Sequence, residues 1–241
     1  MPNTEAAAVL SMRGVQKDYR GLRPLRIRQL EVREGESVAL LGLDRVTAEL
    51  FVNLATGAVA PDKGDVCVFG ESTAAMADGE AWLASLDRFG ILSERAVLLD
   101  GLTVAQNLAM PFSLELDPIP GAVWRHVRSL AEEVGLDDDD LGRLVSEVAP
   151  LLRQRVRLGR ALALGPQLLL NEHPNAPLQA DDVALFAGDL ARVIAARRLA
   201  SITLTADRRF AAAVAPQVLT LEPATGHVSA AAGWRRWFGG G

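Results

Sequence analysis

The chain has 241 residues, enough for one large domain or two small ones with a substantial core. Its net charge of −5 gives no support to nucleic-acid binding, and its single cysteine excludes an internal disulfide. No apolar run approaches the roughly 20 residues that span a bilayer, and no basic region precedes an apolar one at the N-terminus, so we expect a cytosolic protein without a secretory signal.

Strand patterns and helix patterns alternate along the chain. Residues 9–15 and 25–32 alternate apolar and polar side chains, as half-buried strands do, and residues 37–42 are apolar throughout, as a strand buried on both faces is. Further strands are expected at 65–70, 89–92, 167–170, 199–205 and 217–222. Helices are expected at 47–57, 121–135, 151–165 and 179–198. This alternation predicts an α/β domain with a mainly parallel core sheet, and the first two strands, which no helix separates, predict an antiparallel flank.

Three segments follow one another along the chain in the same order as conserved segments of a known protein family. The helix at 47–57 is followed by "PDKGDVCVFG" (61–70), "RQRVRLGRALALGPQLLL" (153–170) joins a helix to a strand, and "VLTLEPATGHV" (218–228) is a strand with a hairpin. From about residue 9 to 228 the chain resembles the ATPase subunits of ATP-binding cassette (ABC) transporters. The resemblance implies an ABC-type P-loop NTPase-like fold, with one domain over 1–232, an inserted helical subdomain at about 95–160 and a Trp- and Arg-rich tail at 233–241.

The phosphate loop of the family reads G-x-x-G-x-G-K-S/T, and the resemblance places it on "GLDRVTAE" (42–49). In such a loop backbone N–H groups cradle phosphate, while the lysine and the hydroxyl residue meet phosphate and magnesium. Only Gly42 remains here. Ala48 stands at the lysine position, and Glu49 stands at the position of the magnesium-binding hydroxyl.

Other motif positions implied by the resemblance are also substituted. Glu94 replaces the glutamine of the glutamine loop, and Ala206 replaces the switch histidine. The signature L-S-G-G-Q becomes "VAPLL" (148–152), in which Pro150 has no backbone N–H to offer a phosphate.

The segment "LLLNEHP" (168–174) allows two alignments with the family. Without a gap, Glu172 takes the place of the magnesium-holding aspartate and His173 that of the catalytic glutamate. A shift of one residue makes Asn171 the aspartate equivalent and Glu172 the glutamate. Glu172 and His173 could also bind a metal, but adjacent residues at a strand end point in opposite directions, so no metal site is expected.

These substitutions indicate that no catalytic set is intact. One carboxylate about 4 Å from a phosphate charge costs roughly 4 kcal/mol at an effective dielectric near 20, and Glu49, Glu94 and Glu172 would converge on one pocket. We therefore expect residues 42–50 to keep the strand–turn–helix path of a phosphate loop without holding phosphate. Side chains should fill the pocket, with Arg45 as the partner of Glu49 or Glu172.

Two positions could still serve a nucleotide. Gly42 ends the buried strand, and Tyr19 lies where the family has an aromatic residue that stacks on adenine. The alternative for Tyr19 is a loop tyrosine that packs on the sheet edge. The segment "LLDGLTVAQNLAMPF" (98–112) resembles the part of the family that helps to receive a coupling helix of a permease.

The leading hypothesis is a pseudo-ATPase that docks on an integral membrane permease in a structural or regulatory role. It implies no cofactor, no nucleic acid, a homodimer or a heterodimer with another ABC ATPase subunit, and a place on the cytoplasmic side of the membrane. One alternative is an active ABC ATPase that uses ATP and magnesium with divergent residues. Another is a soluble module that uses the cleft for a cation or another ligand. The tail "WRRWFGGG" suits a membrane interface or a partner surface, or packs back on its own domain.

Overall fold

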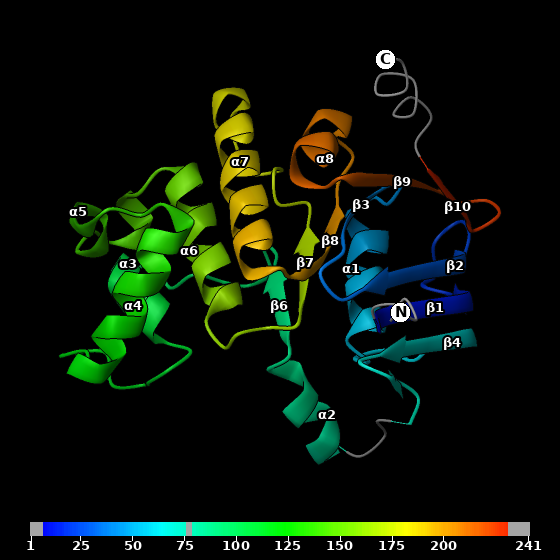
Figure 1. The fold of residues 1–241 in the computed structure, drawn as a ribbon, viewed down its shortest axis with the longest axis horizontal. Helices are drawn as coiled ribbons and strands as arrows, with labels where there is room; N and C mark the ends of the chain where they lie inside the picture. Colours follow the sequence, from blue (N-terminus) through cyan, green and yellow to red (C-terminus); the bar gives the residue numbers. More distant parts are fainter. Residues whose placement is uncertain (1–6, 76–78, 231–241) are drawn as a thin grey trace, which may run out of the picture.

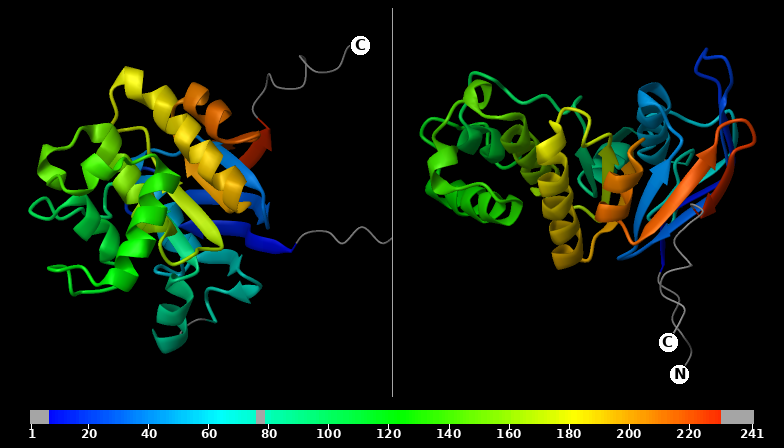
Figure 2. Two further views of the ribbon diagram at one scale, coloured as in Figure 1. Left: turned by 60° about the vertical axis from the view of Figure 1, so that its left-hand side comes forward. Right: turned by 90° about the horizontal axis from the view of Figure 1, so that it is seen from above.

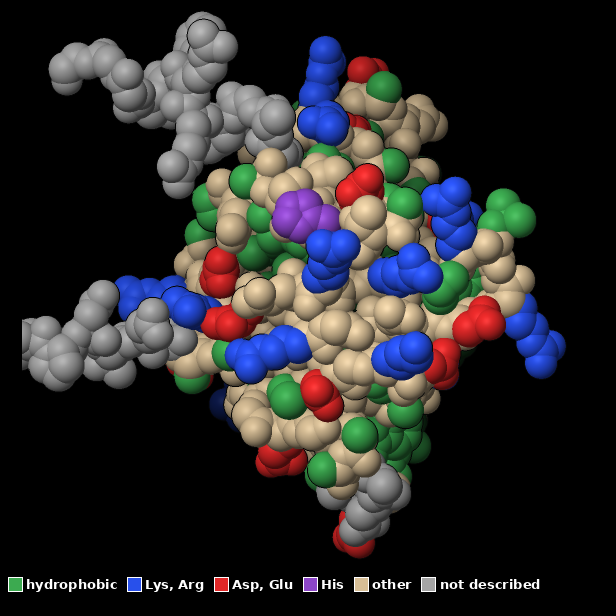
Figure 3. Space-filling model, turned by 90° about the vertical axis from the view of Figure 1, so that its right-hand side faces the viewer, with side chains coloured by type: hydrophobic (Ala, Val, Ile, Leu, Met, Phe, Trp, Pro, Cys, Tyr) green, Lys and Arg blue, Asp and Glu red, His purple; other side chains and the backbone are tan. Residues whose placement is uncertain are grey.

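The computed structural model describes residues 7–75 and 79–230, so the Trp- and Arg-rich tail predicted at 233–241 lies outside the described residues. An antiparallel sheet in the order β2-β1-β4-β5 forms the flank (Figure 1). Its strands are β1 (Ala8–Lys17), β2 (Leu25–Arg33), β4 (Lys63–Val68) and β5 (Glu71–Ser72). On the face of the molecule formed by this flank, Lys and Arg side chains are interspersed with Asp and Glu (Figure 3).

The core sheet has the strand order β10-β9-β3-β8-β7-β6. Its strands are β3 (Ser37–Leu41), β6 (Phe89–Leu92), β7 (Leu168–Glu172), β8 (Ala200–Leu204), β9 (Gln217–Glu222) and β10 (His227–Ala230). All neighbours pair in parallel except β10, which is antiparallel to β9 at the edge. The predicted fold class, a mainly parallel core with an antiparallel flank, is confirmed.

Helices cover both faces of the core sheet (Figures 1 and 2). Helix α1 (Arg45–Ala55) lies on the side of the antiparallel sheet, and α7 (Ala180–Arg197) and α8 (Arg208–Val214) lie on the other side. The remaining helices are α2 (Gly79–Leu86), α3 (Val104–Ala109), α4 (Gly121–Val134), α5 (Asp138–Leu141), the 3-10 turn η1 (Val145–Glu147) and α6 (Pro150–Leu162). Helices α3 to α6 form a lobe at the left of Figure 1, beyond α7.

Strand β7 separates the two large cores and fixes which way its side chains face. Leu168 and Leu170 belong to the core around α1, whereas Leu169 belongs to the core under α4, α6 and α7. Because side chains alternate along a strand, Glu172 continues the face of Leu168 and Leu170 toward α1. Asn171 continues the face of Leu169.

Helix α1 begins two residues earlier than the sequence predicted, at Arg45 rather than at residue 47. The reason is a capping box, in which Asp44 and Thr47 satisfy each other's backbone N–H groups. Helix α8 was not predicted. Its residues "RRFAAAV" are few, and Asp207 starts the helix by accepting hydrogen bonds from the N–H groups of Arg209 and Phe210.

Candidate functional site

The strand–turn–helix path expected for residues 42–50 is present, and Gly42 makes it possible. Gly42 has a φ of +98°, which side chains with a Cβ rarely adopt. A Cβ at this position would come within 2.2 Å of the backbone oxygen of Leu221 in β9. Packing against β9 therefore requires a glycine at the end of β3 whether or not a ligand binds.

A carboxylate covers the N-terminus of α1. The N–H of Thr47 donates to Oδ1 of Asp44 at 2.8 Å, and the Thr47 hydroxyl donates to the same oxygen at 2.6 Å. In return the N–H of Asp44 donates to Thr47 Oγ1 at 2.9 Å. The side-chain and backbone hydrogen bonds from Thr47 lower the pKa of Asp44, so the carboxylate is held ionised where the helix presents its free N–H groups.

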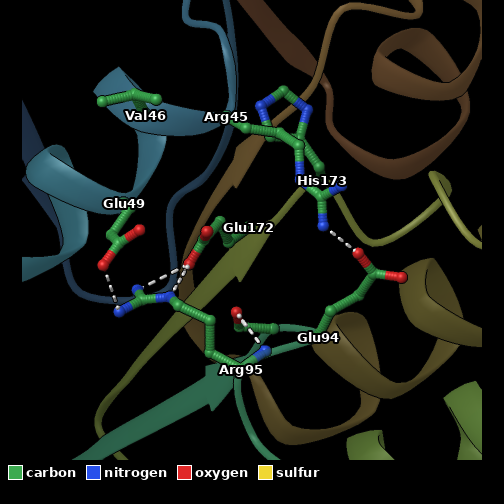
Figure 4. Close-up of a pocket in the computed structure, with 8 residues that line it drawn as sticks. Arg45, Val46, Glu49, Glu94, Arg95, Glu172 and His173 are labelled. Carbon is green, nitrogen blue, oxygen red and sulfur yellow. Dashed lines mark hydrogen bonds and ion pairs between the residues drawn. The ribbon is translucent and has the colours of Figure 1, made fainter.

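A cavity of about 130 Å³ lies beside this helix start, at the carboxyl ends of the core strands (Figure 4). Helix α1, the loop after β6 and the end of β7 contribute its walls: Arg45, Val46, Glu49, Ser93, Glu94, Arg95, Glu172 and His173. The three glutamates that were expected to converge, Glu49, Glu94 and Glu172, all line it.

Arg95 joins the two walls of the cavity. Its Nη2 lies 2.7 Å from Oε2 of Glu172, and its Nη1 lies 3.3 Å from Oε1 of Glu49 (Figure 4). Arg45 forms its ion pair with Glu94. The prediction that Arg45 would pair with Glu49 or Glu172 is therefore wrong.

The physical reason lies in the positions of the two arginines. Arg45 is the first residue of α1, on the outer rim, and its side chain is 75% exposed. The loop after β6 brings Arg95 between α1 and β7, where it can reach both carboxylates. A basic residue directly after Glu94, at a predicted cluster of acidic residues, was the sequence signal for this role.

At the end of β7, Glu172 and His173 both line the cavity, although adjacent strand residues were expected to point apart. His173 has a φ of +43°, so the chain leaves the strand geometry there. Asn171 is fully buried and donates from Nδ2 to Thr203 Oγ1 at 3.0 Å. Across residues 7–75 and 79–230, no group of His, Cys, Asp and Glu side chains is arranged to hold a metal ion.

The other substituted positions lie away from the lining of this cavity. Ala48 is fully buried in the core around α1. Ala206 is exposed in the turn between β8 and α8. Pro150 is the first residue of α6, and no side chain caps that helix.

Tyr19 and Gly42 lie on a second cavity of about 150 Å³, on the other side of the turn at residues 42–47. Arg23, Asp44 and Thr47 also line this cavity. The Tyr19 ring is half-buried against the core around α1 and lies over Gly21, where a Cβ would come within 2.5 Å of the ring. The tyrosine therefore packs against the core around α1 and also lines the second cavity.

No protein-family model matches the chain. The molybdate/tungstate import ATP-binding protein of Pyrococcus horikoshii is 32% identical over 171 residues, which make up 70% of this chain and 47% of that protein. The phosphonates import ATP-binding protein of Anaeromyxobacter dehalogenans is 31% identical over 197 residues, 79% of this chain and 39% of that protein. The lipoprotein-releasing system ATP-binding protein of Pseudomonas fluorescens is 29% identical over 208 residues, 85% and 91% of the two chains.

Solved structures agree with these relatives. The dimeric structure of a bacterial ABC transporter cassette superposes with a TM-score of 0.74 and 18% identity, over 93% of this chain and 100% of that chain. The chain is a relative of the ATP-binding subunits of ABC transporters. The ABC component cbiO1 of Clostridium perfringens superposes with a TM-score of 0.77 and 17% identity, over 92% of this chain and 87% of that chain.

This ABC-type chain spans 47% and 39% of the length of the first two relatives. None of its described helices is long and apolar enough to cross a membrane. The fold is that of an ABC cassette, and the two cavities flank the turn at residues 42–47, where the sequence resemblance places the phosphate loop.

Proposed function

We propose that this ABC-type chain is a pseudo-ATPase subunit that docks on an integral membrane permease in a structural or regulatory role. The observation that carries the proposal is the bridge from Glu49 through Arg95 to Glu172. It joins α1 to β7 with the protein's own charges, at the place where the family holds magnesium and phosphate.

Three features of the turn and the cavity fit ATP and magnesium poorly. The Asp44 carboxylate takes the N–H of Thr47 that a phosphate would need. Ala48 offers no charge and is buried, and Glu49 places a carboxylate where a phosphate charge about 4 Å away would cost roughly 4 kcal/mol at an effective dielectric near 20. Arg95 could offset this repulsion only by pairing with the phosphate. It would then no longer pair with Glu49 and Glu172.

The face of β7 supports the alignment without a gap. Glu172 shares a face with Leu168 and Leu170 and reaches Arg95 beside α1, as expected of the residue that replaces a magnesium-holding aspartate. Asn171 lies on the opposite face and bonds Thr203 inside the sheet. On this alignment His173 takes the place of the catalytic glutamate, and the degenerate site consists of Ala48, Glu49, Glu94, Glu172, His173 and Ala206.

The proposed docking surface lies on the helical lobe, next to segment 98–112. Val97, Leu99 and Leu114 are exposed there by 66%, 43% and 91%. Exposed apolar side chains of this kind suit contact with a partner helix. The relatives are named as import and lipoprotein-releasing ATP-binding proteins, which supports a transporter assembly with a permease at the cytoplasmic side of the membrane, built as a homodimer or a heterodimer.

The domain division belongs to the same proposal. Helices α3 to α6 form the lobe assigned to the helical subdomain at about 95–160, within one domain over 1–232. The lobe connects to the cavity directly, because the loop that carries Glu94 and Arg95 leads into it and Arg160 of α6 donates to the backbone oxygen of Val97 at 2.7 Å.

A second candidate is an ABC ATPase that still uses ATP and magnesium. Tyr19 lines the second cavity, and the family resemblance implies an adenine-stacking aromatic residue at this position, which favours this candidate. The relatives, which are named ATP-binding proteins, favour it as well.

Thermal melting with and without millimolar Mg-ATP separates the two candidates. A ligand of the native state stabilises it by RT ln(1 + [L]/Kd), about 2.7 kcal/mol at 100 times Kd. We expect no change in Tm and no ATP turnover above that of the Glu172→Gln variant. A Tm increase of several degrees that is lost in Tyr19→Ala, or turnover that Glu172→Gln abolishes, would establish the second candidate.

Docking is tested by purification from native membranes. The chain should co-purify with an integral membrane protein, and this association should weaken when Leu99 and Leu114 are changed to Asp. The matched control is Leu185→Asp, because Leu185 is 58% exposed on α7 away from segment 98–112. Recovery of only partnerless monomer would contradict the docking role.

A further inference from the structure

A trough with apolar walls opens between α7 and α8, and we call it the α7–α8 trough. Its volume is about 490 Å³, and its walls include Ala191, Ile194, Ala195, Ala212, Ala213 and Pro216. Ser37, at the start of β3, also lines it. The charged cavity lies at the other end of the parallel strands, where β7 finishes at Glu172, so the two spaces are at opposite ends of the core sheet.

Small side chains create this trough. Ala195 on α7 and Ala212 and Ala213 on α8 are exposed, while Ile194 forms part of the buried floor. Two helices that face each other with alanines leave room for a large apolar side chain between them. The volume falls within the range of about 300–1,000 Å³ that is typical of pockets for small organic groups.

Strand β10 leads the chain toward this trough. In its antiparallel register with β9, His227 lies opposite Glu222 and Ala230 lies opposite Leu219. Strand β10 thus runs toward the start of β9 and ends at Ala230, and Pro216, one residue before that start, is a wall of the trough. Four extended residues span about 13 Å, and the three steps from Leu219 back to Pro216 span about 10 Å, so residue 234 can reach the trough.

The sequence that follows has the composition to fill it. Residues 231–241 read "AAGWRRWFGGG" and include Trp234, Trp237 and Phe238. Such side chains bury about 150–250 Å² each, the largest apolar contribution per residue. Arg198 lines the trough, and its guanidinium can lie on an aromatic face there.

We propose that residues 233–241 of this chain occupy the α7–α8 trough, with tryptophan side chains against its alanine walls. The segment then covers an apolar surface of its own domain and is not free to anchor in a membrane. The proposal stands apart from the proposed function, because the trough lies at the far end of the sheet from the charged cavity.

Tryptophan fluorescence of the full chain tests the proposal. The difference between the emission of the wild type and that of a Trp234→Ala, Trp237→Ala double variant reports the two tail tryptophans, since Trp82 and Trp124 are present in both. We expect difference emission at shorter wavelength, with less acrylamide quenching, than that of the free peptide GWRRWFGGG. Ala195→Glu and Ala213→Glu should shift the difference emission to that of the peptide.

Ala196→Glu is the matched control, because Ala196 is exposed on the same turn of α7 but does not line the trough. It should leave the difference emission unchanged. Peptide-like emission in the wild type without lipid would overturn the proposal. So would a blue shift that appears only with anionic phosphatidylserine vesicles, since the tail would then be a membrane anchor. A response to Ala196→Glu equal to that of Ala195→Glu would overturn it as well.

Discussion

The Arg95 guanidinium reaches Glu172 with two nitrogens, Nη2 at 2.7 Å and Nε at 3.2 Å from the same Oε2. The Glu172 side chain is only 10% exposed, so Arg95 supplies hydrogen bonds that water would supply to an exposed carboxylate. Arg95 lies in the loop after β6, which leads into the helical lobe, and Glu172 lies at the end of β7. The ion pair therefore connects this loop with the core sheet. The same guanidinium also reaches Glu49 of α1, so Arg95 links three elements of the fold.

Replacing Arg95 should destabilise the protein more than breaking a surface pair of the same length. Arg95→Met leaves Glu172 without a counter-charge, and hydrogen bonds to charged groups contribute about 1.5–3 kcal/mol. Lys17 Nζ and Asp62 Oδ1 are also 2.7 Å apart, but the Asp62 side chain is 47% exposed, so Lys17→Met should lower the free energy of unfolding by less than Arg95→Met does. Urea unfolding measures the free energy of unfolding of the two variants. Equal decreases would show that the Arg95 ion pairs stabilise the protein no more than the surface pair does.

The Asp44 cap predicts a pH-dependent contribution to stability. Hydrogen bonds from Thr47 lower the pKa of Asp44 in the folded state. A group with a lowered folded pKa stabilises above its unfolded pKa, about 3.9, and this contribution is lost as the pH falls through the folded pKa. Asp44→Asn should therefore be less stable than the wild type at pH 7, by less than about 1 kcal/mol for this exposed site, and the gap should narrow by pH 3. A gap that stays constant with pH would contradict the role of the charge.

Restoring the lysine of the family at residue 48 should unfold the helix start rather than recover nucleotide binding. Ala48 is fully buried, so Ala48→Lys forces a long charged side chain into the core and should cost more than about 2 kcal/mol. Val46→Lys is the control, because Val46 is 57% exposed and lines the charged cavity, and its effect should be within about 0.5 kcal/mol. Thermal melting with and without Mg-ATP measures the stability of both variants and any binding of nucleotide. A Tm of Ala48→Lys that rises with Mg-ATP would contradict the expectation.

Several features of the fold and the cavity were predictable because they follow from local patterns. The buried run at 37–41 and the alternation at 25–32 became β3 and β2, and the acidic positions Glu49, Glu94 and Glu172 do meet in one cavity. The sequence offers Arg45 and Arg95 as two candidate partners for these glutamates, but it does not show how they pair. Which arginine reaches which glutamate depends on where a loop crosses a sheet edge, and sequence spacing carries no such information.

The left-handed backbone conformation of His173 was not predicted, for a related reason. A left-handed φ at a non-glycine residue has no sequence signal beyond a modest preference of Asn, Asp and His, yet it brings His173 to the same cavity as Glu172. The capping box at Asp44 and Thr47 could have been found, since the two residues have the spacing of that motif.

The last prediction separates packing from ligand binding at Gly42. With a φ of +98° and the backbone oxygen of Leu221 2.2 Å from a Cβ, Gly42→Ala should lower the free energy of unfolding by more than about 2 kcal/mol. Gly188 is the matched control, because it lies inside α7 with nothing within 4 Å of an added Cβ, so Gly188→Ala should stabilise by about 0.5–1 kcal/mol. If Gly42 is retained for its contact with β9, its loss should be the same in the presence and absence of Mg-ATP. A loss of stability that grows when Mg-ATP is added would instead show that this glycine serves a bound phosphate.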